Sequence, residues 1–534
     1  MSEADLKEKQ SPHVEPHGRE KYSVRQMVGL FLGPTLFALM LLLPVARGMS
    51  LGGQRMAAVA LLMSIWWMTE AIPIPATSLL PLVLYPLLGI VIGEPRLGGV
   101  GADRLKQAAA EAAKPYAHHL IFLFLGGFMI ALAMQRWNLH RRIAANIVRK
   151  LSYSPSVLIL GFMIATAFLS MWISNSATTM MMLPIALAVV AHITEQEKKN
   201  GSSAGIGPWK SRFAVCMMLG IAYAASIGGV GTLIGTPPNV LLARHIEEQL
   251  DRKIDFLEWM KVGLPFVIVF LPIAWLVLTR LIYPVRHMRL PHGKEVIEEE
   301  LRMLGKMGRG ETMTAIVFVM TALGWVFLTP KEIAGVEIPG IQTWFPGVKD
   351  STIAMLGALL LFVLPVRLKK GEFVLNWHWA SRLPWGVILL FGGGFALAGG
   401  FAATGLDKWI SQQVEVFRGA HVLVIIIATA TLLIFLTELT SNTATTSMAL
   451  PVFTGIAIGL GHDPMLLLVP LTIAASCAFM LPVATPPNAI VFGSGLVSIP
   501  QMAKAGLILN IIGVVVVTAI SYLLVIPLFN IVVS

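Results

Sequence analysis

Two short polar segments interrupt long apolar stretches of the chain and carry side chains that suit a binding site. Ser174–Thr179 reads Ser-Asn-Ser-Ala-Thr-Thr, and Ser441–Thr446, 267 positions later, reads Ser-Asn-Thr-Ala-Thr-Thr. Hydroxyl and amide groups can donate hydrogen bonds to an anion, and their oxygens can coordinate a small hard cation such as Na⁺. The sequence therefore indicates a repeated polar site inside a largely apolar protein.

A second pair of segments is typical of interrupted helices. Thr236–Asn239 reads Thr-Pro-Pro-Asn, and the same four residues recur as Thr485–Asn488. Two successive prolines stop a helix, because proline lacks the backbone N–H and clashes with the preceding turn. A half-helix that begins after each of the four segments would point the positive end of its dipole at the site. We therefore expect four half-helix ends to converge near the membrane midplane and to bind an anion, while freed carbonyl groups bind a cation.

The repeats also fix an expected symmetry. Phe124–Phe128 recurs as Phe391–Phe395, so three pairs of segments follow in the same order. An odd number of the transmembrane spans that we expect, whose ranges follow below, separates equivalent residues of the two copies. The two copies should therefore have opposite orientations in the membrane. Inverted repeats with interrupted helices in matching positions are typical of secondary transporters. The alternative, that these are only Ser- and Thr-rich helix-packing contacts, suits one isolated motif better than two inverted pairs.

Composition sets the fold class. Of the 534 residues, 56% are hydrophobic and 13% are charged, against roughly 25% charged residues in soluble domains. Two cysteines exclude a disulfide scaffold. We predict an all-α polytopic membrane protein with about 11 transmembrane helices and two re-entrant hairpins. The expected spans are 27–46, 55–71, 77–92, 117–135, 212–234, 262–284, 312–329, 351–366, 384–405, 464–482 and 505–530. The hairpins are 155–173 with 176–193, and 421–440 with 443–460.

The distribution of charge predicts the orientation. Loops rich in Lys and Arg are expected in the cytoplasm, and these are 136–150, 198–212, 286–309 and 367–370. Loops of mixed charge are expected outside, and these are 244–255, 331–350 and 407–418. The assignments agree if each hairpin enters and leaves on one side, which places the N-terminus in the cytoplasm and the C-terminus outside. The net charge of +11 lies mainly in such loops, so nucleic acid is not an expected partner.

The paired motifs resemble those of the divalent anion/sodium symporter family, whose members carry dicarboxylates, citrate or sulfate. Trp66–Pro73 also resembles an early signature of that family, and the resemblance extends over nearly all of residues 27–530. It implies a homodimer in the cell membrane, in which a transport part of each protomer slides as an elevator against a scaffold part. It also implies co-transported sodium ions and no organic cofactor.

The resemblance divides the chain into five parts. These are a cytoplasmic tail at 1–26, a scaffold part with the start of the first repeat at 27–135, the first hairpin with the first broken helix at 155–284, the scaffold part of the second repeat at 312–405, and the second hairpin with the second broken helix at 421–530. The hairpins and broken helices belong to the transport part.

Carried over by position, the resemblance implies two sodium sites and a substrate site. The first sodium ligands are Ser170, Ser174, Asn175 and the carbonyl of Gly235, and the second are Thr437, Ser441, Asn442 and the carbonyl of Ala484. Substrate carboxylates would contact Asn175, Ser176, Asn442 and Thr443, with Thr236, Thr485 and Pro486 nearby. Ser176 stands where the family pattern has Thr. The hydroxyl is kept and a methyl group is lost, so the preferred anion is less strongly indicated.

The predicted function is sodium-coupled symport of a C4-dicarboxylate of the succinate, malate or fumarate type, or of a related divalent anion. A dicarboxylate exchanger and a sodium-coupled sulfate or citrate symporter are alternatives on the same fold. An enzyme is not expected, because the hairpin tips carry amides and hydroxyls without a nearby His or Lys. Glu438, three residues before Ser441, is expected to act as a structural acid, with a proton acceptor or an outer ion ligand as the alternatives.

Overall fold

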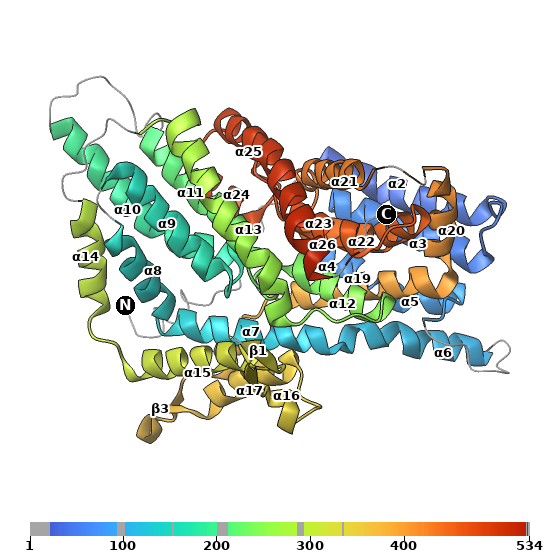
Figure 1. Cartoon of the computed structure of the whole chain (residues 1–534), viewed down its shortest axis with the longest axis horizontal. Helices are drawn as coiled ribbons and strands as arrows, with labels where there is room; N and C mark the ends of the chain where they lie inside the picture. Colours follow the sequence, from blue (N-terminus) through green and yellow to red (C-terminus); the bar gives the residue numbers. More distant parts are fainter. Residues whose placement is uncertain are drawn as a thin grey trace, which may run out of the picture.

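The computed structural model describes residues 22–92, 102–151, 154–199, 212–285, 293–333, 336–417, 419, 421–529 and 531. These residues are mainly helical (Figure 1). Two short antiparallel hairpins join β1 (Lys331–Ile333) to β2 (Val336–Ile338) and β3 (Pro365–Arg367) to β4 (Glu372–Phe373). Residues 1–21 of the expected cytoplasmic tail, and most of the basic loop expected at 198–212, lie outside the described residues.

The first half of the chain contains α2 (Val24–Leu42), α3 (Leu51–Thr69), α4 (Ile74–Thr77), α5 (Leu80–Leu88), α6 (Ala102–Ala113), α7 (His119–Arg136), α8 (Leu139–Lys150), α9 (Pro155–Ser170), α10 (Asn175–Lys199), α11 (Arg212–Gly229), α12 (Pro237–Gln249) and α13 (Phe256–Leu276). The second half contains α14 (Gly293–Leu304), α15 (Arg309–Val326), α16 (Ile341–Trp344), α17 (Asp350–Val363), α18 (Trp377–Ala380), α19 (Trp385–Thr404), α20 (Leu406–Val414), α21 (Val422–Thr437), α22 (Asn442–Gly459), α23 (Met465–Ala475), α24 (Pro486–Gly493), α25 (Ile499–Ile520) and α26 (Ile526–Leu528).

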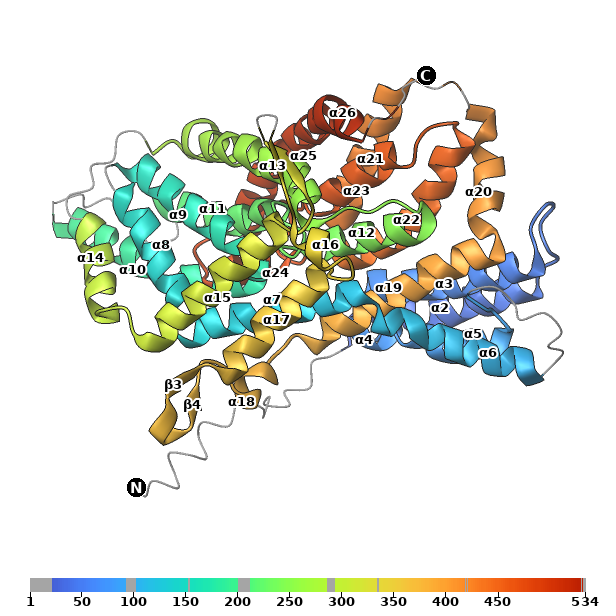
Figure 2. The ribbon, with the colours of Figure 1, turned by 60° about the horizontal axis from the view of Figure 1, so that its bottom comes forward.

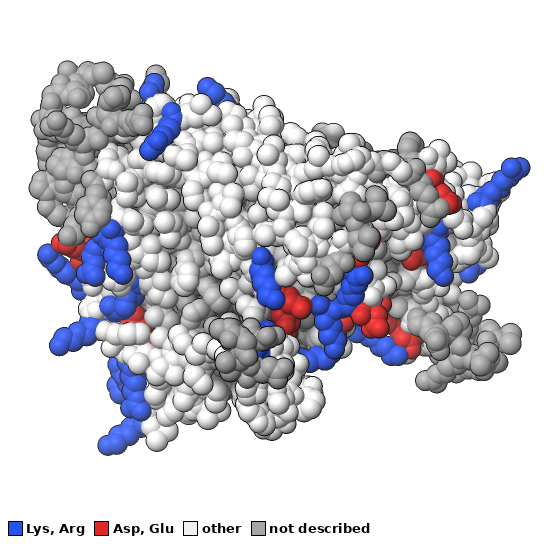
Figure 3. All heavy atoms as spheres, viewed as in Figure 1, with Lys and Arg blue, Asp and Glu red and all other residues white. Residues whose placement is uncertain are grey.

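Several helices have the length and composition of membrane spans. Within the described part of the chain, six are long and apolar enough to cross a bilayer, namely Val24–Leu42, Gln107–Arg136, Arg212–Gly229, Phe256–Ile282, Trp385–Thr404 and Ile499–Leu528. Shorter apolar helices include both arms of the first expected hairpin, Pro155–Ser170 and Asn175–Ala191, and the first arm of the second, Val422–Thr437. The face drawn in Figure 3 is largely uncharged over α9, α11, α13 and α25, as suits contact with lipid. The protein is therefore a multi-pass helical membrane protein.

The expected loops contain more helix than predicted. The segments 136–150, 286–309, 244–255 and 407–418 contain or overlap α8, α14, the end of α12 and α20. In α8 the reason is an amphipathic pattern, because Leu139, Ala144 and Val148 are buried while basic residues occupy the other face. Charge density correctly marks a segment outside the apolar spans, but it does not exclude a helix.

Two predicted spans also end early. The span expected at 212–234 is helical only to Gly229, and the one expected at 464–482 is helical only to Ala475. The residues that follow, 230–236 and 476–485, are mostly turns and irregular backbone before the prolines of α12 and α24. Hydropathy alone missed these breaks, because the unwound residues are themselves largely apolar.

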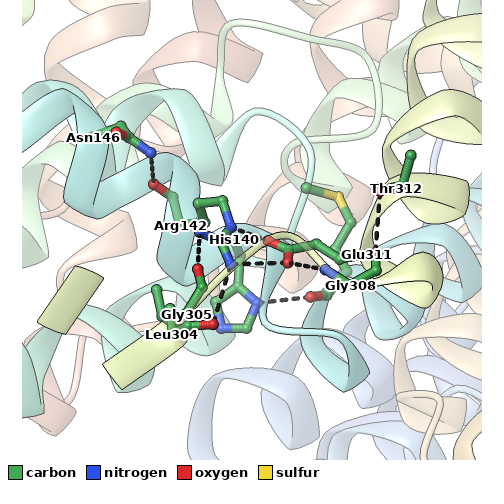
Figure 4. A network of polar contacts seen from close by, with 9 residues as sticks. His140, Arg142, Asn146, Leu304, Gly305, Gly308, Glu311 and Thr312 are labelled. Carbon is green, nitrogen blue, oxygen red and sulfur yellow. Dashed lines mark hydrogen bonds and ion pairs between the residues drawn. The ribbon is translucent and has the colours of Figure 1, made fainter. Parts of the chain in front are cut away.

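Arg142 joins α8 to the two helices that follow the first repeat (Figure 4). Its guanidinium Nη2 lies 3.1 Å from Glu311 Oε2 at the start of α15, and its Nη1 donates to the carbonyl of Gly305 at 3.0 Å. Asn146 donates to the carbonyl of Arg142 at 2.8 Å. Helix α8, which connects α7 to the first hairpin, is therefore held against the residues around the end of α14 and the start of α15.

We expect His140 to make the protein less stable in mild acid. The ring is buried, and its Nδ1 lies 2.9 Å from the carbonyl of Met134 (Figure 4). It belongs to the segment 136–150, outside the expected spans. Burial lowers the pKa of His140 to about 4, and the charge of Arg141 adds to this effect. An unfolded His titrates near pH 6.5, so protons bind the unfolded chain more readily and stability should be lost as the pH falls from about 6.5 to about 4.

Thermal unfolding of the detergent-solubilised protein at a series of pH values between 7 and 4 measures this effect. His140→Gln should flatten the decline over that range. His378→Gln replaces an exposed imidazole and should leave the decline unchanged. Parallel pH profiles for the wild type and His140→Gln would show that His140 does not contribute.

The two repeats have matching elements in matching contacts. The order α7, α8, α9, α10, α11, α12, α13 in the first repeat corresponds to α19, α20, α21, α22, α23, α24, α25 in the second. Helix α10 packs against α24, and in return α22 packs against α12. The equivalent rings of Phe124 and Phe391 meet with their centroids 4.9 Å apart. Reciprocal contacts of this kind are what two copies of one unit make around a common axis.

The remaining helices form a layer beside the repeats. Helix α7 extends lengthwise in Figure 1, with α15 and α17 on one side and the first hairpin on the other, and α17 packs closely along it. Figure 2 shows α2, α3 and α5 grouped near α19, away from α9 and α11. Both α7 and α19, which fall within the ranges that the resemblance assigns to the scaffold, therefore lie between the hairpin elements and the other helices of those ranges.

Candidate ion and substrate site

The tip of the first hairpin gathers oxygen atoms from three helices. Helix α9 ends at Ser170 and α10 begins at Asn175, with a short turn between them. The hydroxyl oxygen of Ser170 lies 2.7 Å from Asn175 Oδ1 and 2.7 Å from the carbonyl oxygen of Ala225 on α11. The hydroxyl has a single proton and the other two atoms are acceptors only. The cluster therefore has more lone pairs than hydrogens, which suits a cation.

The tip of the second hairpin repeats this arrangement. Thr437 at the end of α21 takes the place of Ser170, and Asn442 at the start of α22 takes the place of Asn175. The Thr437 hydroxyl oxygen lies 2.6 Å from Asn442 Oδ1 and 3.0 Å from the carbonyl oxygen of Ala475 on α23. In both hairpins a Thr hydroxyl one turn further on donates to the Asn carbonyl at 2.8 Å. The sequence repeat is thus a repeat of hydrogen bonds.

The two broken helices are closed by equivalent asparagines. Asn239 Nδ2 donates to the carbonyls of Gly229 at 3.2 Å and Thr232 at 2.7 Å. Asn488 Nδ2 donates to the carbonyls of Ala478 at 3.2 Å and Leu481 at 3.0 Å. In each case the acceptors lie ten and seven residues before the asparagine. The last residue of each Thr-Pro-Pro-Asn segment therefore satisfies carbonyl groups that the missing helical turn leaves free.

Close backbone approaches join the first broken helix to the first hairpin tip. A Cβ atom added to Gly229 would lie 2.6 Å from Asn175 Oδ1, and one added to Gly235 would lie 2.4 Å from the carbonyl oxygen of Gly229. Only glycine at these positions leaves room for the asparagine side chain beside the unwound backbone. Gly235 thus packs against Gly229, and Gly229 in turn borders the Asn175 side chain.

The other predicted residues lie at or next to these helix starts. Ser174 and Ser441 are the last residues before α10 and α22, and Ser174 Oγ accepts weakly from the Ala177 N–H at 3.4 Å. Ser176 and Thr443 occupy the first turns, with Ser176 half-buried and Thr443 buried. Thr236 and Thr485 are buried N-caps of α12 and α24, Pro486 is exposed, and Ala484 is buried in the second break.

Glu438 marks the main difference between the repeats. Its carboxylate accepts the backbone N–H groups of Phe479, Met480 and Leu481 at 2.6, 2.9 and 3.1 Å, and it also accepts Asn510 Nδ2 at 2.7 Å. The residue is 3% exposed. Three contacts stabilise the unwound segment after α23 and the fourth joins it to α25, so these are the contacts of a structural acid.

The equivalent position in the first repeat is Met171. There the backbone carbonyl of Met171 accepts the hydroxyl of Thr232 in the first break. A neutral hydroxyl–carbonyl bond thus replaces the carboxylate with its four donors. Sequence reasoning missed Thr232 and Asn510 as partners of the two breaks. Asn510 was detectable, because it is an isolated amide inside the apolar run expected at 505–530.

A multi-pass helical fold with two copies of an oxygen-rich site at interrupted helices defines a secondary membrane transporter. The sequence model described as "Sodium:sulfate symporter transmembrane region" matches residues 25–531. The chain belongs to this family, which confirms the resemblance seen in the paired motifs.

Curated relatives carry the same description in different species. The chain is 41% identical over 516 residues to a sodium-dependent dicarboxylate transporter, SdcS, of Staphylococcus saprophyticus, which covers 96% of this chain and 94% of the relative. It is 41% identical over 509 residues to the transporter of the same name from Staphylococcus aureus, which covers 94% of this chain and 92% of the relative. The similarity therefore extends over nearly the whole length of both relatives.

Two solved structures share the fold. The YdaH transporter of Alcanivorax borkumensis aligns with a TM-score of 0.54 at 14% identity, covering 88% of this chain and 98% of that one. MtrF of Neisseria gonorrhoeae, described as representing a class of antimetabolite efflux pumps, aligns with a TM-score of 0.56 at 14% identity, covering 86% and 96%. At this identity the likeness concerns the arrangement of helices and not the substrate.

Proposed function

We propose that the protein is a sodium-coupled symporter of C4-dicarboxylates such as succinate, malate and fumarate. The observation that carries the proposal is the pair of matching oxygen clusters, Ser170 with Asn175 and Thr437 with Asn442, each completed by a carbonyl of the next helix. A small hard cation satisfies such a cluster better than one shared proton does. The two relatives named sodium-dependent dicarboxylate transporters support the choice of ion and anion.

The asparagines supply the coupling between cation and anion. In each hairpin the Asn Oδ1 faces the oxygen cluster, so its Nδ2 is left to donate to a carboxylate. The neighbouring backbone N–H groups of Ser176 and Thr443 lie in the first turns of α10 and α22, where the helix dipole favours an anion. A bound Na⁺ would hold each amide in its donating orientation and would offset one negative charge of the substrate. Loading the cations thus prepares the anion site.

The complete ligand set that we propose follows the repeat. The sodium ligands are Ser170, Ser174, Asn175 and the Gly235 carbonyl in the first site, and Thr437, Ser441, Asn442 and the Ala484 carbonyl in the second. The two carboxylates of the substrate meet Asn175 with Ser176 and Asn442 with Thr443, next to Thr236, Thr485 and Pro486. Two cation sites and two carboxylates match in number, which balances charge in a medium of low dielectric constant.

The transport cycle that we propose is of the elevator type in a homodimer. The parts 155–284 and 421–530 move together, because α10 packs on α24 and α12 packs on α22. The parts 27–135 and 312–405 form the scaffold, and the eleven spans are arranged as inverted repeats with the N-terminus in the cytoplasm and the C-terminus outside. The basic segments at 136–150 and 367–370 support this orientation.

Uptake of labelled succinate into proteoliposomes tests the function. An inward Na⁺ gradient should drive succinate above its equilibrium level, and replacing Na⁺ by K⁺ should abolish this accumulation. Uptake that requires internal dicarboxylate and ignores the Na⁺ gradient would show an exchanger instead. Preference for sulfate or citrate over succinate in competition would contradict the proposed substrate class.

A further inference from the structure

A compact group of imidazoles and carboxylates lies where the beginning of α7 meets the end of α12. His118 and His119 come from the α7 side, while Glu247 and Glu248 come from the last turn of α12. One His119 nitrogen, Nε2, lies 3.1 Å from Glu247 Oε1 and 3.0 Å from Oε2. His118 Nε2 lies 3.6 Å from Glu248 Oε1, and the two imidazole centroids are 4.4 Å apart. None of these residues belongs to the proposed sodium or dicarboxylate sites.

We propose that His118, His119 and Glu247 form a binding site for a transition-metal dication of the Zn²⁺ type. One ligand atom from each of the three residues lies within 4.8 Å of the others. Two imidazoles and a carboxylate are a common ligand set for zinc, with a fourth position open to water, and bonds of about 2.0–2.2 Å place such ligands roughly 3.3–3.6 Å apart. Small side-chain rotations would therefore close the site. Imidazole ligands favour zinc over Mg²⁺ or Ca²⁺.

The side chains of the proposed metal site are partly exposed and border a cavity. The side chains of His118, His119 and Glu247 are 15%, 28% and 22% exposed. A cavity of about 210 Å³ is lined by His119 and Glu247 and gives access to the group. The metal would bind His119 Nε2, the nitrogen that faces Glu247, and the ring proton would then lie on Nδ1, which is buried and makes no hydrogen bond.

Two cationic side chains border the group, and both can coexist with a bound metal. Arg244 is paired with Glu248, with Nη2 2.6 Å from Oε1, and its guanidinium lies over the ring of Phe395 at 3.8 Å. Glu247 therefore remains available. Lys349 Nζ lies 3.6 Å from Glu247 Oε1, but its side chain is 46% exposed and can turn towards solvent. Lys349 thus competes with the metal for the same carboxylate.

A bound metal would also join two parts of the molecule. Helix α12 carries Thr236–Asn239 at its start and Glu247 near its end, while α7 packs along α17 in the other layer. If α12 moves relative to α7 during transport, a metal shared by Glu247 and the two histidines holds them together. This consequence for transport rests on the proposed function, whereas metal binding itself does not.

Calorimetric titration of the purified full-length protein with ZnCl₂ tests the binding. We expect one Zn²⁺ site per protomer. The affinity for Zn²⁺ should fall at least tenfold in His119→Ala and in Glu247→Gln. It should rise severalfold in Lys349→Gln, because the competing cation is removed. His378→Ala, which removes an exposed imidazole elsewhere, should bind as the wild type does. Equal affinities for the wild type, His119→Ala and Glu247→Gln would overturn the proposal, provided that both variants keep the thermal midpoint of the wild type.

A transport measurement tests the link between α7 and α12. Zn²⁺ should inhibit succinate uptake by the wild type and not by Glu247→Gln, while Mg²⁺ at the same concentration should have no effect. Tight binding without inhibition would overturn the bridging role. Because the titration needs no transport activity, failure of the proposed symport function would leave its result intact.

Discussion

Asn175→Ala should lower the initial rate of sodium-driven succinate uptake by about 100-fold, and Asn442→Ala should do the same. Each asparagine oxygen lies within 2.7 Å of a hydroxyl in a cluster rich in acceptors, and in the site that we propose each amide nitrogen binds a carboxylate. In that proposed site, alanine removes a cation ligand and an anion donor together. A hydrogen bond to a charged group contributes about 1.5–3 kcal/mol, and the upper end of that range corresponds to about 100-fold.

The matched control is Asn146→Ala. Asn146 donates to the carbonyl of Arg142 on α8, away from both hairpin tips, and uptake by this variant should stay within about twofold of the wild type. Initial rates at several Na⁺ concentrations, normalised to correctly folded protein in the liposomes, give the comparison. Wild-type rates in either Asn175→Ala or Asn442→Ala would exclude that asparagine from the site.

Asn175→Asp separates the two roles of the side chain. The carboxylate keeps an oxygen for the cation, but it replaces the amide donor with a negative charge that repels the substrate. Sodium should therefore still stabilise the variant against heat, whereas succinate should add no further stabilisation. Loss of the sodium effect together with the succinate effect would mean that the two ligands are not separable at this residue.

The sequence located the hairpin tips and the broken helices because their signals are local. Consecutive prolines at 237–238 and 486–487 fit only the start of a helix, and Ser and Asn favour the residues that cap a helix N-terminus. Composition and the recurring apolar runs likewise identified a multi-pass membrane protein. The family, and with it the transporter class, followed from the same few residues.

The remaining features depend on tertiary contacts that residue types do not reveal. The carbonyls of Ala225 and Ala475 complete the two clusters, yet every residue has a carbonyl, and only the packing of α11 and α23 brings these two to the site. Helix α23 ends at Ala475 although apolar residues continue, because a distant carboxylate binds the backbone that follows. The charge of segments 136–150 and 407–418 predicts loops, whereas the structure has the helices α8 and α20 there.

Glu438→Ala should destabilise the protein by several kcal/mol and leave little of it folded. The substitution removes the acceptor of three buried backbone N–H groups and of the Asn510 amide. Each buried donor left without a partner costs about 1–3 kcal/mol, and in the membrane interior no bulk water replaces the lost oxygen atoms. Thermal unfolding followed by tryptophan fluorescence measures the change. Glu70→Ala removes an exposed carboxylate 3.8 Å from Arg25 and should leave the midpoint unchanged.

Glu438→Gln distinguishes structural support from proton transfer. Glutamine keeps one acceptor oxygen, but its NH₂ group would face a backbone N–H donor, so we expect a midpoint between those of the wild type and Glu438→Ala. Protein that does fold should still accumulate succinate on a Na⁺ gradient, because the substitution leaves the two proposed sodium sites intact. If Glu438→Gln is as stable as the wild type but loses uptake, and if a pH gradient alone drives uptake by the wild type, the carboxylate carries a proton. The contacts with residues 479–481 would then belong to the deprotonated state of Glu438. Protonation of the carboxylate would release these N–H groups and would loosen the second broken helix in each transport cycle.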